Sequence, residues 1–197
     1  MTATRTLPEN YTLRWDFDLK REMRAALFLQ AVGIVFFMLF GIGLGAYIRY
    51  IRPNLDFQQA LFGAWDGWAL VGMLLFSIML VISLHEGVHG LFFWVFTRAQ
   101  PVFGLGWGYA YACAPGWYFT RGQYAIIGLA PFVLLNAVGL TLLAVSPAVW
   151  IGALFWLVLL NASGSVGDLW FIARILKEPG DILVEDTGEG FRVYGRG

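Results

Sequence analysis

Long apolar runs separated by short charged segments set the pattern of the chain. The first uncharged run lies between Arg24 and Arg49, and at about 1.5 Å per helical residue it is long enough to cross roughly 30 Å of hydrocarbon. The last uncharged stretch, from Arg121 to Asp168, is too long for one crossing, and a Ser-Pro pair at 146–147 divides it. The pattern predicts four membrane-spanning helices, at residues 25–48, 67–97, about 124–145 and about 148–173.

Two shorter stretches alternate with a period of two, which is typical of β-strands. In VFGLGWGYAYACAP, from Val102 to Pro115, large side chains alternate with Gly and Ala, which predicts a hairpin with one bulky face and one nearly bare face. In the tail, apolar runs flank the segment 187–190, which predicts a second hairpin. The expected fold is an α-helical polytopic membrane protein with about four transmembrane helices and two small β-hairpins.

The placement of basic residues predicts how the helices are oriented. Hydrophobic residues make up 59% of the chain and charged residues 13%, as in an integral membrane protein. The N-terminal tail, the loop after the second helix and the C-terminal tail carry most of the Lys and Arg, so both termini are expected in the cytoplasm. We expect a cytoplasmic segment at 1–24, a transmembrane domain at 25–176 and a cytoplasmic tail at 177–197.

Charge and cysteine content limit the chemistry that the chain can support. The formal net charge is zero, so nothing points to nucleic acid, and the expected surroundings are the lipid bilayer. Cys113 is the single cysteine, which excludes an intrachain disulfide and a structural zinc site built from several thiolates. Residues 1–24 are polar and mixed in charge, unlike a cleavable signal peptide.

The segment SLHEGVHG, residues 83–90, places three ionisable groups inside the second apolar helix. His85 and His89 are the only histidines, and residues four apart on a helix share one face. Imidazole nitrogens bind zinc, and Glu86 would act as general base beside the open ligand position. Each such group costs about 2.5 to 3.5 kcal/mol in a membrane helix, so a function is the default interpretation. A structural polar network between helices is the alternative.

Asp168 is the one further acid within the predicted helices. It lies six residues before Arg174, and His89 lies nine before Arg98, so their depths agree within about 5 Å. Asp168 would be the third metal ligand, or it would pair with Arg174. Asn161 could orient the bound water or a substrate carbonyl, or hydrogen-bond another helix. The predicted site comprises His85, His89 and Asp168 as metal ligands, Glu86 as the catalytic base and Asn161 in substrate binding.

These motifs resemble the site-2-protease class of intramembrane zinc metalloproteases. That class has H-E-x-x-H-G on one helix and an Asp downstream of an Asn on a later helix, as in HEGVHG at 85–90 and NASGSVGD at 161–168. The segment GLAPFVLLNAVG is similar to a third element of the class. Residues 67–194 resemble still more closely a bacterial membrane family of zincin peptidases, which implies a bacterial inner membrane. The resemblance implies zinc ligands at His85, His89 and Asp168, and a base at Glu86.

We expect a Zn²⁺-dependent peptidase that hydrolyses peptide bonds of membrane-associated proteins or peptides, in or near the membrane. The strand at 102–114 would hold an extended substrate by β-augmentation, or rest on the bilayer with Trp107, Tyr109 and Tyr111 as anchors. Two other functions stay open: a non-proteolytic zinc-binding scaffold or chaperone, and a proton- or metal-coupled transporter, which four short helices disfavour. Four helices are few to enclose a site, which leaves room for a homo-oligomer.

Overall fold

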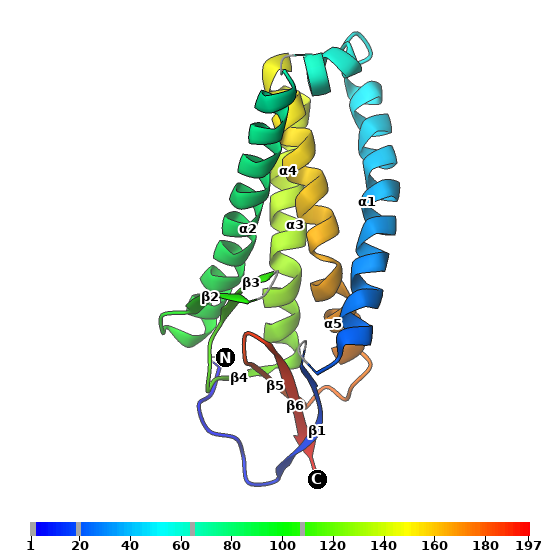
Figure 1. The fold of residues 1–197 in the computed structure, drawn as a ribbon. Helices are drawn as coiled ribbons and strands as arrows, with labels where there is room; N and C mark the ends of the chain where they lie inside the picture. Colours follow the sequence, from blue (N-terminus) through cyan, green and yellow to red (C-terminus); the bar gives the residue numbers. More distant parts are fainter. Residues whose placement is uncertain (1–2, 19–20, 64–65, 107–108) are drawn as a thin grey trace. The chain divides into compact units, whose positions relative to one another are not determined.

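A computed structural model describes residues 3–18, 21–63, 66–106 and 109–197, and most of these residues are helical (Figure 1). In this part of the chain, four stretches are long and apolar enough to cross a membrane. They are α1 (Met23–Ile51), α2 (Gly67–Thr97), α3 (Arg121–Val145) and a fourth stretch made of a 3₁₀ turn (Ala148–Trp150), α4 (Ile151–Gly164) and α5 (Val166–Ile175). The predicted polytopic helical fold is confirmed, and the chain is a multi-pass membrane protein.

Ser165 interrupts the last of these stretches, between α4 and α5. Its backbone amide and its hydroxyl both donate to the carbonyl oxygen of Asn161, at 3.1 and 2.8 Å. α4 ends at Gly164 and α5 begins at Val166, and a serine hydroxyl bonded to the carbonyl four residues earlier often bends a helix. Asp168 therefore lies in the first turn of α5, where the helix dipole favours a negative charge.

Four short strands form one antiparallel sheet that joins distant parts of the chain. In spatial order they are β1 (Tyr11–Asp18), β6 (Gly190–Arg196), β5 (Leu183–Asp186) and β4 (Tyr118–Thr120). The β5–β6 hairpin is the one predicted for the tail, and its turn includes Gly188 at a φ of 78°, a conformation that favours glycine. The strands β1 and β4 were not predicted.

β1 changes face along its length. Its pairing with β6 shifts by one residue between Leu13, which lies opposite Tyr194, and Trp15, which lies opposite Val193. Leu13 is exposed and Phe17 is buried. The alternation of Tyr11, Leu13, Trp15 and Phe17 is the sequence signal for this strand, but the shift divides it between two faces.

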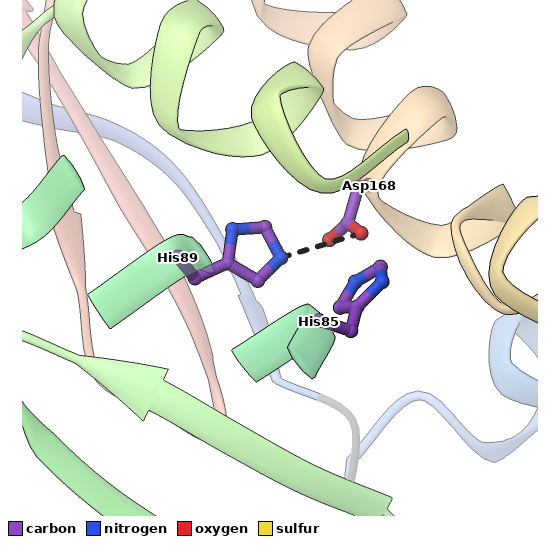
Figure 2. Close-up of side chains that lie close together, drawn as sticks. All are labelled: His85, His89 and Asp168. Atoms are coloured by element: carbon purple, nitrogen blue, oxygen red, sulfur yellow. Dashed lines mark ion pairs between the residues drawn. The ribbon is translucent and has the colours of Figure 1, made fainter. Parts of the chain in front are cut away.

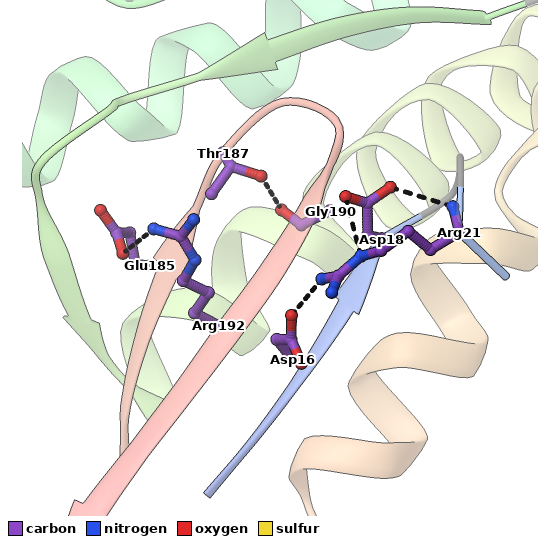
Figure 3. A network of polar contacts seen from close by, with 7 residues as sticks. All are labelled: Asp16, Asp18, Arg21, Glu185, Thr187, Gly190 and Arg192. Atoms are coloured by element: carbon purple, nitrogen blue, oxygen red, sulfur yellow. Dashed lines mark hydrogen bonds and ion pairs between the residues drawn. The ribbon is translucent and has the colours of Figure 1, made fainter. Parts of the chain in front are cut away.

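The outer face of the sheet carries exposed ion pairs. Arg21 contacts Asp16 and Asp18, and Arg192 lies 3.5 Å from Glu185 (Figure 3). Exposed pairs of this kind contribute only about 0–1 kcal/mol each. The sheet is therefore held mainly by its inner face, which contributes buried residues such as Phe119, Val184 and Val193 to an apolar core.

β2 (Val102–Gly106) and β3 (Tyr109–Cys113) form the predicted hairpin between α2 and α3. The prediction of one bulky face is wrong. Phe103 pairs with Ala112, and Gly104 pairs with Tyr111. Because paired residues share a face, the large residues of β2 lie beside alanines and the tyrosines of β3 lie over glycines. Trp107 lies outside the described residues.

The chain divides into two compact units that interleave along the sequence. Unit 1 comprises residues 1–30, 86–131 and 167–197, and unit 2 comprises residues 31–85 and 132–166. The core of unit 1 is rich in aromatic residues, including Phe93, Phe119, Tyr124 and Phe171. The core of unit 2 is mainly aliphatic, including Leu44, Ile48, Leu143, Ile151 and Leu159. The division passes through α1, α2 and α3, which are continuous helices.

Candidate metal centre

Two imidazoles project from one side of α2. His85 and His89 are 9% and 8% exposed, and their spacing of four residues places them about one turn apart on the same face. Gly90 follows His89, and the ring of Phe103 occupies the space that a side chain at Gly90 would need. The hairpin strand β2 therefore packs directly against the turn of α2 that carries His89.

Asp168 completes a group of three candidate ligands. Its Oδ2 lies 3.5 Å from Nε2 of His89, and the side chains of His85, His89 and Asp168 point toward one another (Figure 2). One ligand atom from each lies within 4.8 Å of the others, and within the described residues no other group of three is arranged in this way. Arg174 places its guanidinium 5.1 Å from the ring centroid of Trp15. Asp168 and Arg174 are six residues apart on α5, which places their side chains on different faces of the helix and disfavours the alternative pairing.

The other ring nitrogen of each histidine has a hydrogen-bond partner. Nδ1 of His85 lies 3.0 Å from Oδ1 of Asn161, and Nδ1 of His89 lies 3.0 Å from the carbonyl oxygen of Ile127. Carbonyl oxygens only accept, so both Nδ1 atoms carry the proton. A ring bonded in this way binds a metal through the lone pair of Nε2, which is the usual arrangement for a metal-binding histidine.

The donor set fits zinc. Two imidazoles and one carboxylate with a fourth position left for water are typical of catalytic zinc sites. Zinc–ligand bonds of about 2.0 to 2.2 Å at tetrahedral angles separate neighbouring ligand atoms by about 3.3 Å. The distance of 3.5 Å between His89 and Asp168 is close to this value. His85, His89 and Asp168 are thus the residues that would hold the ion.

Glu86 lies beside these ligands on α2. It is half-buried, and the space around the neighbouring Gly87 is open. Successive helical residues are about 100° apart, so Glu86 flanks the face that carries the histidines. A carboxylate at this position suits a general base that acts on a water bound near His85 and His89.

One family model matches the chain. It is described as "Putative zincin peptidase", and it covers residues 78–183, which is more than half of the 197 residues. The chain belongs to this family. The matched region begins in α2 and ends in β5, so it includes His85, Glu86, His89, Asn161 and Asp168. No curated protein and no solved structure matches the chain. A zincin peptidase is a zinc metallopeptidase, in agreement with the donor set described above.

The protein also buries a carboxylate that the sequence did not single out. Asp186 on β5 accepts hydrogen bonds from the hydroxyl of Tyr124 and from the amide of Gly188. Burial raises the pKa of Asp186 to about 6, although these two hydrogen bonds act in the opposite direction. Asp186 directly precedes the predicted turn at 187–190, and its hydrogen bond with Tyr124 of α3 shows that it points into the core of unit 1.

Proposed function

We propose that this zincin peptidase hydrolyses peptide bonds of membrane-associated proteins or peptides, with zinc held by His85, His89 and Asp168. The grouping of these three ligands supports the proposal more than any other observation. Burying ionisable groups in a membrane helix costs free energy, and one cation bound by all three side chains would offset that cost. The family match adds that a zinc peptidase is the expected class.

Glu86 is the proposed general base. A zinc ion at this centre would acidify a water molecule and polarise the scissile carbonyl. Glu86 accepts the proton of the attacking water and passes it to the leaving amine. His85 and His89 are oriented for this role, because each donates its Nδ1 proton to a fixed oxygen. Their apolar surroundings strengthen the electrostatic interactions within the site.

The substrate must be extended where it is cut, because the carbonyls of a helix are hydrogen-bonded and enclosed. Strand β2 packs against α2 at Gly90, so a peptide paired with an edge of the β2–β3 hairpin would run close to His89. Contact with lipid is the other predicted role of the hairpin, and Leu105, which is 84% exposed, suits it. Strand pairing uses the backbone edge and lipid contact uses a side-chain face, so the two roles are compatible.

The proposed location is a bacterial inner membrane with both termini in the cytoplasm. The support is the distribution of Lys and Arg, most of which lie in the two tails and in the segment between α2 and α3. α2 and α5 both lead into those basic segments, with His89 eight residues before the end of α2 and Asp168 seven residues before the end of α5. The metal centre would therefore lie toward the cytoplasmic side of the bilayer.

The decisive experiment separates zinc binding from proteolysis. Purified protein should contain about one zinc per chain, which His85→Ala and Asp168→Ala should lose and Glu86→Gln should keep. Membrane proteomes of cells with wild type or Glu86→Gln should differ by uncut substrates, and Glu9→Gln, remote from these residues in sequence, is the matched control. Wild-type protein without zinc would overturn the proposal. Equal proteomes with zinc present would favour the non-proteolytic scaffold.

A further inference from the structure

The imidazoles of His85 and His89 are oriented by two different kinds of hydrogen-bond acceptor, a side-chain amide and a backbone carbonyl. Asn161 lies in the last turn of α4, is 2% exposed, and places Oδ1 on Nδ1 of His85. Its backbone carbonyl accepts two hydrogen bonds from Ser165, which fix this turn. The residue is therefore held rigidly behind the ring of His85.

The acceptor for His89 is available because of a proline. In an α-helix the carbonyl of residue i accepts from the amide of residue i+4. The residue four positions after Ile127 is Pro131, which lies inside α3 and has no N–H. The carbonyl of Ile127 thus lacks its usual intrahelical donor, and it accepts from Nδ1 of His89 instead.

We propose that Asn161 and Pro131 are positioning residues of the metal centre, which hold His85 and His89 in the tautomer that presents Nε2 to the metal. Neither contacts the reacting atoms: Asn161 acts through His85, and Pro131 acts through Ile127 and His89. This replaces the sequence-based assignment of Asn161 to substrate binding. The inference rests on the proposed zinc function, although the two Nδ1 hydrogen bonds are present without metal.

An amide at position 161 is chemically well suited to this task. Its oxygen is a neutral acceptor, so it orients His85 without adding a second negative charge beside Asp168. A carboxylate at position 161 would still accept from Nδ1, but it would bury a charge that is unpaired when the metal is absent. Asn161→Asp should therefore keep the orientation of His85, and Asn161→Leu should lose it.

The first measurement reads each ring separately. The chain has two histidines, so NMR of purified metal-free protein labelled with ¹⁵N-histidine gives only two sets of imidazole signals. Wild type should show both rings protonated on Nδ1. Asn161→Leu should change His85 alone, and Pro131→Ala, which restores an amide that competes for the carbonyl of Ile127, should change His89 alone. Each variant is thus the control for the other.

The second measurement is zinc affinity, by chelator competition in the Glu86→Gln background. Removing a residue that orients a ligand typically weakens binding by about 10- to 100-fold. We expect this loss for Asn161→Leu, a smaller loss for Pro131→Ala, and an affinity within a few-fold of wild type for Asn161→Asp. Asn136→Leu is the matched control, since Asn136 is also buried in unit 2 but donates to the carbonyl of Phe132.

The outcomes separate the positioning roles of Asn161 and Pro131 from the proposed zinc peptidase function. If Asn161→Leu and Pro131→Ala leave both tautomers and the zinc affinity unchanged, the positioning roles are wrong while the zinc peptidase proposal stands. Asn161→Leu with normal zinc affinity but a raised KM would return this residue to substrate binding. If wild type binds no zinc but shows the expected tautomers, the proposed function fails and the positioning of the rings is retained.

Discussion

Units 1 and 2 bury their polar groups in different ways. In unit 1, a backbone carbonyl of α3 binds His89, and a sheet residue, Asp186, binds Tyr124 of α3. In unit 2, the contact between His85 and Asn161 joins two side chains, and the surrounding core is mainly aliphatic. A backbone acceptor cannot be removed by a substitution at its own residue, whereas a side-chain acceptor can. The two histidines should therefore respond to different mutations.

Removal of a metal ligand should lower the zinc affinity more than any other change. The loss should be similar for His85 in unit 2 and for His89 in unit 1. His85→Ala and His89→Ala each leave two protein ligands, fewer than catalytic zinc sites use. Both should lose zinc by more than the roughly 10- to 100-fold expected for a residue behind a ligand. Chelator competition on purified protein measures this. If one of the two variants retained zinc with wild-type affinity, the ligand set proposed here would be incorrect.

Matched glycine substitutions in α3 should separate the units. A methyl group at Gly139 in unit 2 would collide with a branch methyl of Val158, whose side chain is stiff. At Gly128 in unit 1 it would lie 2.7 Å from Cδ1 of Ile172, the flexible end of its side chain. Overpacking costs about 1–3 kcal/mol, so Gly139→Ala should lower the unfolding midpoint in detergent more than Gly128→Ala.

The same two substitutions should affect the zinc affinity in the reverse order. Gly128 adjoins Ile127, whose carbonyl orients His89, so a shift there should weaken zinc binding by a few-fold. Gly139→Ala should leave the zinc affinity unchanged, because Gly139 is three turns further along α3. An equal loss of zinc in both variants would show that the orientation of His89 depends on α3 as a whole.

Asp186 should make the stability of the metal-free protein depend on pH. Burial raises the pKa of its carboxyl from 3.8 to about 6. The native state therefore holds a proton that the unfolded state has lost, so this contribution is fully present below about pH 4 and is lost as the pH rises through 6. The loss is on the order of 3 kcal/mol. Asp186→Asn should flatten the pH dependence of the unfolding midpoint, with Glu185→Gln on the outer face as control.

Cys113 should give the smallest effect, as a probe of how closely β3 is packed in unit 1. Burial, followed by the charge of Asp186, raises the pKa of its thiol to about 12. Because the thiolate is the reactive form, maleimide should label Cys113 slowly in mild detergent and fast in SDS. Asp186→Asn should change the slow rate only slightly. Fast labelling of the native protein would mean that β3 leaves the core.

Sequence patterns predicted the parts of this protein that depend on local composition. Uncharged runs gave the helices, and the spacing of His85 and His89 gave two ligands on one face. β1 was missed because its pairing with β6 is distant in sequence and its alternation crosses a register shift. The faces of the β2–β3 hairpin depend on which residues pair across the turn, which alternation along one strand does not reveal.

The surroundings of the ligands were harder to predict for a chemical reason. The acceptor for His89 is a backbone carbonyl, and every residue has one, so no side chain marks it. Pro131 was visible in GLAPFVLLNAVG. Its importance became clear only because the carbonyl of Ile127, four positions earlier, accepts a hydrogen bond from His89 on α2. Asp186 was not singled out because it directly precedes the predicted turn at 187–190, and its partner Tyr124 is distant in sequence, in α3.

The order of the strands has a consequence for how the protein is made. β6 lies between β1 and β5, so the sheet cannot form until residues 190–196 have left the ribosome, after all four apolar stretches. β1 is synthesised before the first of them and must wait for its partner, and such distant pairings form slowly. Tyr124 likewise gains its bond to Asp186 only at this late stage. An arrested chain that ends before β5 would already contain every zinc ligand, but its sheet would be unformed.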